Sequence, residues 1–417
     1  MDGLRRSVLR NTAILAAATA LNWAVIVLLA SLATLTIALL FGLPELAGSG
    51  FGLYLLAYAA GGLAFGRAID RWGRRNGLVV AFIVGVGGAL VIYAGVGAGS
   101  LPVFLLGLLA IGVGTGGANL ARVAGADMYP PERRARGISL VLLGAAFGAI
   151  GAPIVFAPAL AGARTNEAAA LAAPWLIAAG LMLAGALVLL AIRVDPRRIA
   201  EELAAEPARA SGIAAAPAVP PRPLAELTRL PTVPLALLAA VLSQAVMTSV
   251  MALAGVVMAH HGHDLGRISL TVGLHFLGMF GLVLIVGRVV ERIGRLRSIV
   301  LGLLMLAAGV LMLLPGAELL NFMPGMFVVG VGWNVAFVAS TTVLADAARP
   351  NERGRLLGFS DFVAILGAAA LSVVAGLIVG TLGLPALVLV GVLLALVPAV
   401  LIGLYRRRLE GAPAALG

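Results

Sequence analysis

The hydrophobic positions of this chain form long runs separated by short polar or Gly/Pro-rich breaks. A helix needs about 20 predominantly apolar residues to cross a bilayer, and twelve runs approach or exceed that length. Each run is longer than a membrane strand requires, so we expect helices, which satisfy their backbone hydrogen bonds internally. The runs cover residues 12–40, 50–66, 78–97, 102–125, 138–160, 174–193, 232–258, 268–287, 298–315, 320–344, 356–379 and 384–405.

The composition agrees with this pattern. Of the 417 residues, 61% are hydrophobic and 11% are charged, and the mean hydropathy is +1.09. Most of the chain must therefore be dissolved in lipid, as in an integral membrane protein. The first run is too long for a signal peptide and is expected to stay in the membrane. The sequence contains no cysteine, which excludes disulfides and thiolate metal sites.

The positive charge predicts the orientation in the membrane. The net charge is +11, and all 29 basic residues are arginine. Arg5, Arg6 and Arg10 precede the first run, whereas only Arg164 and Arg267 fall in the expected outer loops. This asymmetry follows the positive-inside rule and predicts a cytoplasmic (inner) membrane protein with both termini in the cytoplasm. The charge therefore indicates contact with anionic lipid rather than with nucleic acid.

A change in composition divides the chain. Residues 194–231 are rich in Ala, Pro and charge and predict a cytoplasmic linker, helical at 196–205 and extended at 217–223. The linker separates an N-terminal six-helix bundle, residues 1–193, from a C-terminal six-helix bundle with a short cytoplasmic tail, residues 232–417. The predicted fold is an all-α membrane protein with twelve transmembrane helices in two pseudo-symmetric bundles.

The two halves repeat each other in sequence. "GRAIDRWGRR" at 66–75 matches "GRVVERIGRL" at 287–296, which lies 221 positions later. "ADMYPPERRARG" at 126–137 matches "ADAARPNERGRLLG" at 345–358, and "GVGTGGAN" in the fourth run matches "GVGWN" in the tenth. Parallel repeats of six helices, with a substrate site near the bilayer midplane, are the architecture of one large class of secondary transporters.

The loop after the second run resembles the signature of the major facilitator superfamily, and the resemblance covers the whole chain. It implies a fold that works by alternating access, without a permanently bound cofactor. It also implies that the loop acts as a latch when the cytoplasmic side is closed. Glycine permits close helix approach, and a carboxylate can cap a helix N-terminus or pair with arginine. The predicted gating residues are Gly66, Asp70, Arg71, Gly73 and Arg74, with Glu291 and Arg292 in the second copy.

Glu291 stands where the first copy has an aspartate, so the second copy is expected to latch less tightly. The alternative for both copies is that their charges only set the topology. The latch itself argues against a membrane receptor or assembly factor that has lost transport, because latch residues need a moving gate.

Polar side chains at membrane depth are costly and are therefore functional candidates. By resemblance, the first, fourth, seventh and tenth spans line the central cavity, so their amides are predicted to contact the substrate. These amides are Asn22, Asn119, Gln244 and Asn334, with Gln244 at the repeat position of Asn22.

Two ionisable residues in the spans, Arg122 and Asp361, are predicted to couple transport to an ion. Alternatively, Asp361 caps its helix or pairs with a gate arginine. Arg122 alternatively marks only the end of its helix.

Two helical pairs suggest a metal site. Met247 and Met251 are four residues apart on the seventh span, as are His275 and Met279 on the eighth, so each pair shares a helix face. Counted from the loop at 259–267, Met251 and His275 lie about 12 Å deep, and Met247 and Met279 about 18 Å deep. Thioethers and an imidazole without a thiolate or carboxylate suit Cu(I). The alternatives are methionines that fill gaps and a histidine that bonds across the helices.

The same four residues resemble the motif pair of the CcoA-type copper importers, a branch of the superfamily, which implies copper as the substrate. The outer-loop histidines His260, His261 and His263, beside Asp264, are candidates to capture the metal first. The alternative is that this loop is only a solvated turn.

These patterns favour a copper importer, with a monomeric chain in contact with lipid. The second hypothesis is a proton-coupled transporter or exporter of a small organic solute or drug, with His275 as a proton site. The sequence contains no phosphate loop, so neither an enzyme nor direct drive by ATP is expected.

Overall fold

The computed structural model describes residues 2–41, 43, 47–161, 167–210, 220–263, 265–316 and 318–410. Within those ranges the regular structure is helical, and eleven helices are long and apolar enough to cross a membrane. The predicted ninth span corresponds to helix α13, Arg295–Leu311, whose 17 residues make it shorter than any of the eleven. The prediction of an all-helical membrane fold is therefore confirmed.

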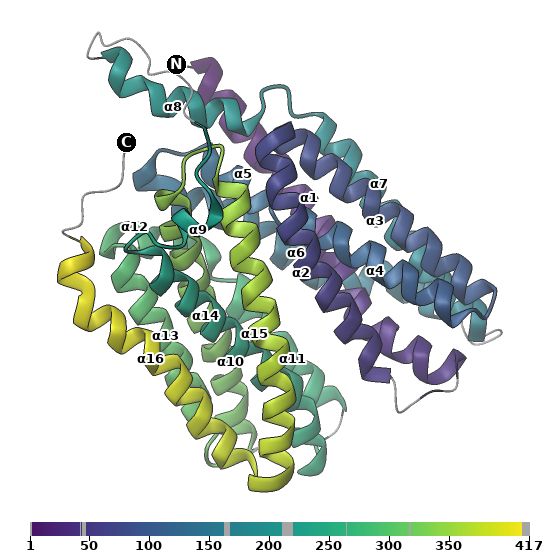
Figure 1. Ribbon diagram of the computed structural model, residues 1–417. Helices are drawn as coiled ribbons and strands as arrows, with labels where there is room; N and C mark the ends of the chain where they lie inside the picture. The colour runs from purple at the N-terminus through teal and green to yellow at the C-terminus, as the bar shows by residue number, and fades with distance from the viewer. Residues whose placement is uncertain are drawn as a thin grey trace. The chain divides into compact units, whose positions relative to one another are not determined.

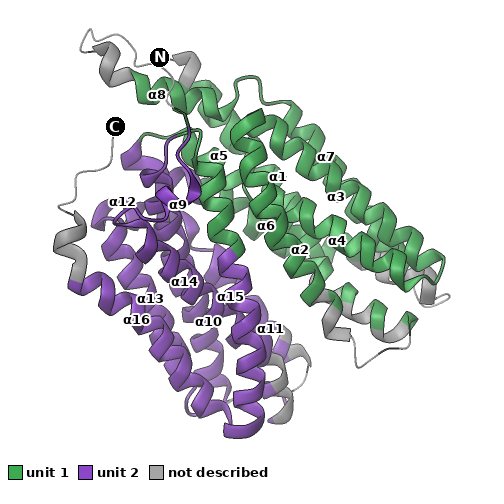
Figure 2. Ribbon diagram, viewed as in Figure 1, with its two compact units in different colours: residues 1–130, 140–220, 350–362 green, residues 131–139, 221–349, 363–417 purple. Residues whose placement is uncertain are grey.

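The chain forms two compact units, coloured green and purple in Figure 2. Unit 1 comprises residues 1–130, 140–220 and 350–362, and unit 2 comprises residues 131–139, 221–349 and 363–417. The main boundary falls inside the predicted linker. The units differ from the predicted bundles because each contains a short segment from the other sequence repeat. These segments are 350–362 in unit 1 and 131–139 in unit 2, and both begin a long helix.

In unit 1, α3 packs along α4 and α7, α2 packs along α4, and α1 packs along α7 (Figure 1). A Cβ atom on Gly88 of α3 would lie 2.3 Å from the backbone nitrogen of Ile111 in α4, so glycine permits this approach. The helices are α1 (Asp2–Leu35, followed by a π-helical turn at Thr36–Leu40), α2 (Ala47–Trp72), α3 (Arg74–Gly97), α4 (Leu101–Ala118), α5 (Ala121–Asp127), α6 (Arg134–Ala161, which begins in unit 2), α7 (Glu167–Leu190) and α8 (Pro196–Ala210).

Unit 2 repeats this packing, because α13 packs along α14 and α16, α11 along α14, and α10 along α16. The eighth span is interrupted between α11 and α12, and the fourth between α4 and α5. The helices are α9 (Leu224–Leu227), α10 (Val233–His260), α11 (Leu265–Phe280), α12 (Val283–Ile293), α13, α14 (Leu319–Ala347), α15 (Arg353–Leu382, of which 353–362 belong to unit 1) and α16 (Leu384–Glu410).

The linker begins as a helix, as its sequence predicts. Helix α8 extends the expected segment 196–205 to Ala210, and it buries Ile199 and Ala200. It packs against α5, α3 and α1 of unit 1. Of the segment expected to be extended, residues 217–219 lie outside the described residues, and residues 220–223 have no regular secondary structure.

Candidate functional site

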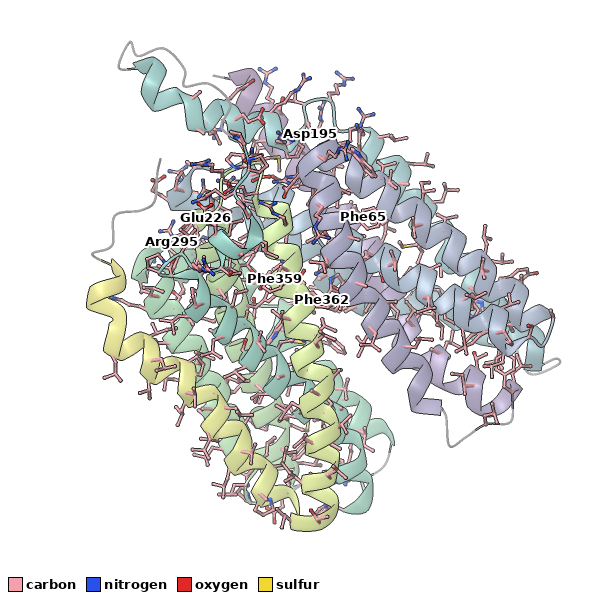
Figure 3. All side chains as sticks on the ribbon, viewed as in Figure 1. Phe65, Asp195, Glu226, Arg295, Phe359 and Phe362 are labelled. Carbon is pink, nitrogen blue, oxygen red and sulfur yellow. The ribbon has the colours of Figure 1, made fainter. Side chains whose placement is uncertain are left out.

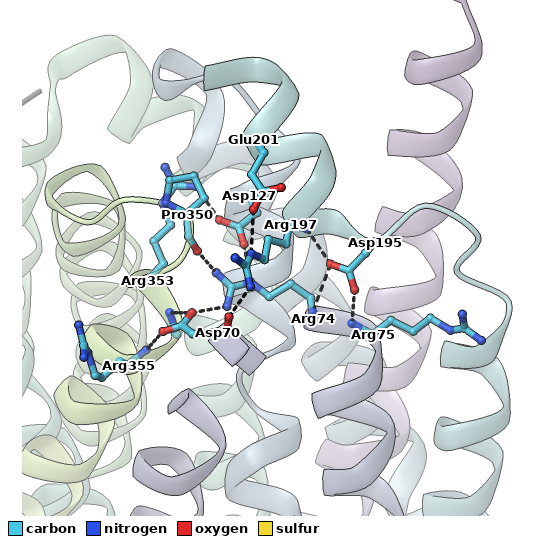
Figure 4. Close-up of polar contacts among 11 residues, drawn as sticks. Asp70, Arg74, Arg75, Asp127, Asp195, Arg197, Glu201, Pro350, Arg353 and Arg355 are labelled. Carbon is cyan, nitrogen blue, oxygen red and sulfur yellow. Dashed lines mark hydrogen bonds and ion pairs between the residues drawn. The ribbon is translucent and has the colours of Figure 1, made fainter. Parts of the chain in front are cut away.

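Charged side chains gather at one end of each unit, around Asp195 in unit 1 and around Arg295 and Glu226 in unit 2 (Figure 3). In unit 1, the Asp70 carboxylate accepts hydrogen bonds from Arg74 Nη1 at 2.6 Å, from the Gly354 amide at 2.9 Å and from the Arg355 amide at 2.7 Å (Figure 4). Helix α15 begins at Arg353, so Asp70 places its negative charge at a helix N-terminus.

Arg74 extends this cluster. Its side chain is fully buried, and it donates from Nε to Asp127 at 2.6 Å and from Nη2 to the Pro350 carbonyl at 2.7 Å. The other oxygen of Asp127 accepts from Arg353 Nη1 at 2.6 Å. We call Asp70, Arg74, Asp127, Arg353 and the amides of Gly354 and Arg355 the first loop network. The negative charges of its two carboxylates cancel the positive charges of its two guanidinium groups, which offsets the cost of burying each charge.

Glycines bring the backbones together beside this network. A Cβ atom on Gly66 of α2 would lie 2.4 Å from the Gly354 carbonyl oxygen, and one on Gly358 would lie 2.3 Å from the Gly62 carbonyl oxygen. The first turns of α15 therefore lie directly on α2. By contrast, the loop arginines Arg71 and Arg292 are exposed.

Unit 2 contains the second loop network, in which repeat-related residues make several of the same contacts. Arg295 Nε donates to Asp346 at 3.0 Å and Arg134 Nη1 to the other oxygen of Asp346 at 2.5 Å, while Arg295 Nη2 donates to the Pro131 carbonyl. Glu291 accepts from the Arg136 amide at 2.8 Å. The side chains of Arg295 and Asp346 are 29% and 28% exposed, whereas those of Arg74 and Asp127 are fully buried.

The two predicted coupling residues bind each other. Arg122 Nη2 lies 2.5 Å from Asp361 Oδ1, and Arg122 Nη1 donates to the carbonyl of Asn119 at 3.0 Å. One of the alternatives from the sequence was an ion pair between Asp361 and a gate arginine. The ion pair is present, but its partner is Arg122 and not an arginine of a loop. Asp361 Oδ2 is buried without a hydrogen-bond partner in the described part of unit 1. The pair therefore retains a free acceptor.

Amides from the first helix of each repeat contact the fourth helix. In unit 1, Asn22 Nδ2 donates to the Thr115 carbonyl at 3.3 Å, and the Thr115 hydroxyl lies 3.2 Å from that of Tyr54. In unit 2, Trp333 Nε1 donates to Gln244 Oε1 at 2.9 Å, and Gln244 Nε2 donates to Thr248 at 3.0 Å. Trp333 stacks on Phe337 with ring centres 4.8 Å apart.

Two atoms of the predicted amides lack partners among the described residues. Both Asn22 Oδ1 and Asn334 Nδ2 are buried and unpaired. A buried polar group without a partner costs about 1–3 kcal/mol, so each such group needs an explanation, and a bound molecule is one. Sequence reasoning selected these amides but missed Tyr54, Thr115 and Phe337. Tyrosine and threonine are common in ordinary helices, and only the contacts single them out.

The histidine of the proposed metal site faces α14. His275 Nδ1 donates to the Met326 carbonyl at 2.8 Å, and a Cβ atom on Gly330 would lie 2.4 Å from the His275 carbonyl oxygen. Met247 and Met279 are buried, and Met251 is partly exposed. Counting depth along the helices did not anticipate the bond to α14, because depth does not give the direction of a side chain.

The outer-loop histidines differ in their surroundings. His261 is exposed, with Nδ1 2.8 Å from the Val257 carbonyl oxygen, and His263 is partly buried. The side chain of His260 and the whole of Asp264 lie outside the described residues. Among the described residues, no three His, Asp or Glu side chains are grouped so that they could hold a metal ion.

The sequence model described as Major Facilitator Superfamily matches residues 12–248 and 235–416. The chain belongs to the major facilitator superfamily. It is 31% identical over 363 residues to the uncharacterized transporter YdeG of Bacillus subtilis, with 86% of this chain and 83% of YdeG covered. It is 30% identical over 372 residues to the riboflavin transporter RfnT of Brucella anthropi, with 88% of each chain covered.

Solved structures of the superfamily have the same fold. The E. coli fucose:proton symporter FucP superposes with a TM-score of 0.73 at 15% identity, with 95% of this chain and 99% of that chain covered. The human organic anion transporter MFSD10 superposes with a TM-score of 0.72 at 18% identity, with the same coverage. A bacterial homologue of ferroportin also gives 0.72, at 15% identity, with 95% of this chain and all of that chain covered. This protein is therefore an integral membrane transporter of the superfamily.

Proposed function

We propose that the protein moves a small organic solute across the cytoplasmic (inner) membrane by alternating access, with both termini in the cytoplasm. The observation that carries this proposal is that each unit buries an unpaired amide atom, Asn22 Oδ1 in unit 1 and Asn334 Nδ2 in unit 2. Within unit 1, Asn22 Oδ1 is an acceptor that a donor group of a solute would satisfy, and within unit 2, Asn334 Nδ2 is a donor that an acceptor group would satisfy. Soft Cu(I) prefers thioether and imidazole ligands to an amide oxygen such as that of Asn22, and the amide nitrogen of Asn334 is a hydrogen-bond donor rather than a metal ligand.

The aromatic residues of unit 2 favour a solute with a flat ring. The Trp333 indole is fixed by its bond to Gln244 and stacks on Phe337 with an interplanar angle of 15°. Phe280 meets the indole edge-on at 84°. A fixed ring system of this kind favours stacking with another flat ring. The 30% identity to a riboflavin transporter supports the same class of solute and makes riboflavin the first probe.

We further propose that protons drive transport through Asp361. A proton that binds to the free Oδ2 neutralises the carboxylate and weakens its attraction for Arg122. The guanidinium group can then pair with an anionic group or with another carbonyl. His275 is the second candidate proton site, because its Nε2 is buried and unpaired in the described part of unit 2.

Copper uptake is the second candidate function, and one observation favours it. His275 donates Nδ1–H to a backbone carbonyl, which leaves the Nε2 lone pair free. Metal-binding histidines are commonly oriented in this way by the ring nitrogen that does not bind the metal. Met247, Met251 and Met279 would complete a soft ligand set around Cu(I).

Uptake into proteoliposomes tests the two functions together. We expect saturable, proton-driven uptake of radiolabelled riboflavin, or of another solute from a panel of flat-ring compounds. Asn22→Ala and Asn334→Ala should each reduce this uptake by about tenfold, equivalent to about 1.4 kcal/mol. Met251→Leu, which keeps the volume and removes the thioether, is the matched control and should leave the uptake unchanged.

Radiocopper uptake is measured on the same vesicles. If wild type moves copper but no solute of the panel, and Met251→Leu and His275→Ala abolish copper movement, the organic-solute proposal fails. If Asn22→Ala and Asn334→Ala move the solute as well as wild type, the assignment of the amides fails.

A further inference from the structure

The start of the linker contacts the first loop network at several points. Asp195, the residue before α8, accepts hydrogen bonds from the amides of Arg74 at 3.2 Å and Arg75 at 2.9 Å, the first two residues of α3. The same carboxylate accepts from the amide of Arg197 at 2.8 Å, in the first turn of α8. One side chain therefore caps the N-termini of two helices, where the helix dipole also favours its negative charge.

Gly73 makes this double cap possible. Its φ of +89° lies in a region that other residues rarely adopt, and α3 has no side-chain cap from Gly73 itself. A Cβ atom on Gly73 would lie 2.8 Å from Asp195 Oδ2, so a side chain there would displace the carboxylate. The loop glycine is thus needed for its backbone conformation and for the space it leaves.

The linker also holds the carboxylate residue of the loop. Arg197 Nη1 donates to the backbone carbonyl of Asp70, and Arg197 Nε donates to Glu201 at 2.9 Å (Figure 4). Asn11 of α1 donates to the Val194 carbonyl at 2.9 Å, and Ile199 is fully buried. The linker start is therefore fixed on unit 1 and contacts both Asp70 and Arg74 through their backbones.

The second loop has no counterpart to this arrangement among the described residues. Gly294 has the same backbone conformation as Gly73, with φ of +90°. A Cβ atom on Gly294 would meet nothing within 4 Å, and α13 has no side-chain cap from that residue. Among the described residues, such a contact is therefore found at the first copy and not at the second.

We propose that Asp195 and Arg197 are positioning residues that hold the first loop network in the arrangement that binds the start of α15. The linker thereby sets how readily this start leaves α2. The inference depends only on the movement of this segment and not on which solute is carried, so its test needs no substrate.

The absence of cysteine allows a direct test with single-cysteine variants of the full chain. Ser360→Cys, a nearly isosteric change, places a thiol on a buried residue of the α15 segment in unit 1. Ser139→Cys places one on a buried residue of unit 2, beside Gly287 of the second copy. The rate of maleimide labelling from the predicted cytoplasmic side reports how often each residue becomes exposed.

Asp195→Ser separates the two roles of Asp195. Serine caps a helix nearly as well as aspartate, so α8 keeps its N-cap. Its neutral, shorter side chain cannot reach the two amides of α3. We expect labelling of Ser360→Cys to rise several-fold in Asp195→Ser and in Arg197→Ala. Labelling of Ser139→Cys should not change. Glu202→Gln, which alters an exposed carboxylate of α8, is the control that should leave both rates unchanged.

Two outcomes would overturn the inference. One is an unchanged rate at Ser360→Cys in Asp195→Ser under conditions in which Asp70→Asn raises it. The other is an equal rise at Ser360→Cys and Ser139→Cys, which would mean general loosening of the protein. The labelling experiment decides whether the inference holds even if no solute is found to be transported, because it measures exposure of the thiols and not uptake.

Discussion

The first and second loop networks have nearly the same contacts in very different surroundings. Each has an arginine that donates to one aspartate and to one proline carbonyl, and a second arginine on the same aspartate. In the first network Arg74 and Asp127 are fully buried, but in the second Arg295 and Asp346 are more than a quarter exposed. The same hydrogen bonds therefore stabilise the folded protein by different amounts, because solvent screens the second set and not the first.

The carboxylate in the last turn of α2 or α12 shows the same difference. Asp70 accepts two backbone amides and one guanidinium group, whereas Glu291 accepts one backbone amide. The first copy also has the linker contact. We infer that the first network holds its helix start firmly and the second holds it loosely.

The largest difference is expected for the central aspartates. Asp127→Asn removes the fully buried carboxylate that Arg74 and Arg353 share, so that Arg74 keeps only Asp70 of its two carboxylate partners, and should destabilise the protein by about 3–5 kcal/mol. Asp346→Asn removes a partly exposed charge and should cost about 0–1 kcal/mol. Thermal melting of the purified variants in detergent compares them. Equal melting temperatures for the two variants would contradict the difference in burial.

The next largest difference is expected for the helix-capping carboxylates. Asp70→Asn weakens three hydrogen bonds to an ionised group, each worth about 1.5–3 kcal/mol, and should clearly raise labelling of Ser360→Cys. Glu291→Gln weakens one exposed bond and should change labelling of Ser139→Cys little. Maleimide labelling rates of the two double variants provide the measurement. A larger rise in labelling with Glu291→Gln than with Asp70→Asn would mean that the second network, and not the first, holds its helix start firmly.

The close backbone contacts should differ less. Gly66→Ala forces a methyl group against the Gly354 backbone carbonyl and should cost about 1–3 kcal/mol. Gly287→Ala instead meets the side chain of Ser139, with the hydroxyl oxygen at 2.6 Å and Cβ at 2.9 Å, so rotation of that hydroxyl relieves part of the contact. Melting temperatures compare the variants, and Gly287→Ala combined with Ser139→Ala is the control that should restore the part of the loss caused by the Ser139 hydroxyl.

The smallest difference is expected for the two glycines with positive φ. Gly73→Ala and Gly294→Ala carry the same backbone strain of about 1–3 kcal/mol. Only Gly73→Ala also displaces Asp195, so it should be less stable by about the value of a helix cap, ~1 kcal/mol. If the two variants have the same melting temperature, Asp195 contributes nothing measurable to the stability of the first loop.

The sequence predicted the fold well because long apolar runs and matching segments about 220 residues apart are strong signals. It also predicted that Asp70 would cap a helix or pair with arginine. It could not predict that residues 350–362 belong to unit 1 or that Asp195 caps α3, because both depend on contacts between distant parts of the chain.

The candidate substrate site was predicted less completely. Hydropathy singled out Asn22 and Asn334 because polar groups in apolar runs are conspicuous. The bond from His275 to the Met326 carbonyl has no signal in the sequence, since every residue carries a carbonyl. The spacing of the methionines and His275 predicts a shared depth, and whether copper binds there stays a prediction.

Hydrogen exchange of the wild-type protein tests the central comparison without any substitution. The amides of Gly354 and Arg355, bound by Asp70, are compared with the amide of Arg136, bound by Glu291, in peptides covering 350–357 and 131–138. A firmer first network predicts exchange about tenfold slower at Gly354 and Arg355, equivalent to about 1.4 kcal/mol. Equal rates, or faster exchange at Gly354 and Arg355, would contradict the account.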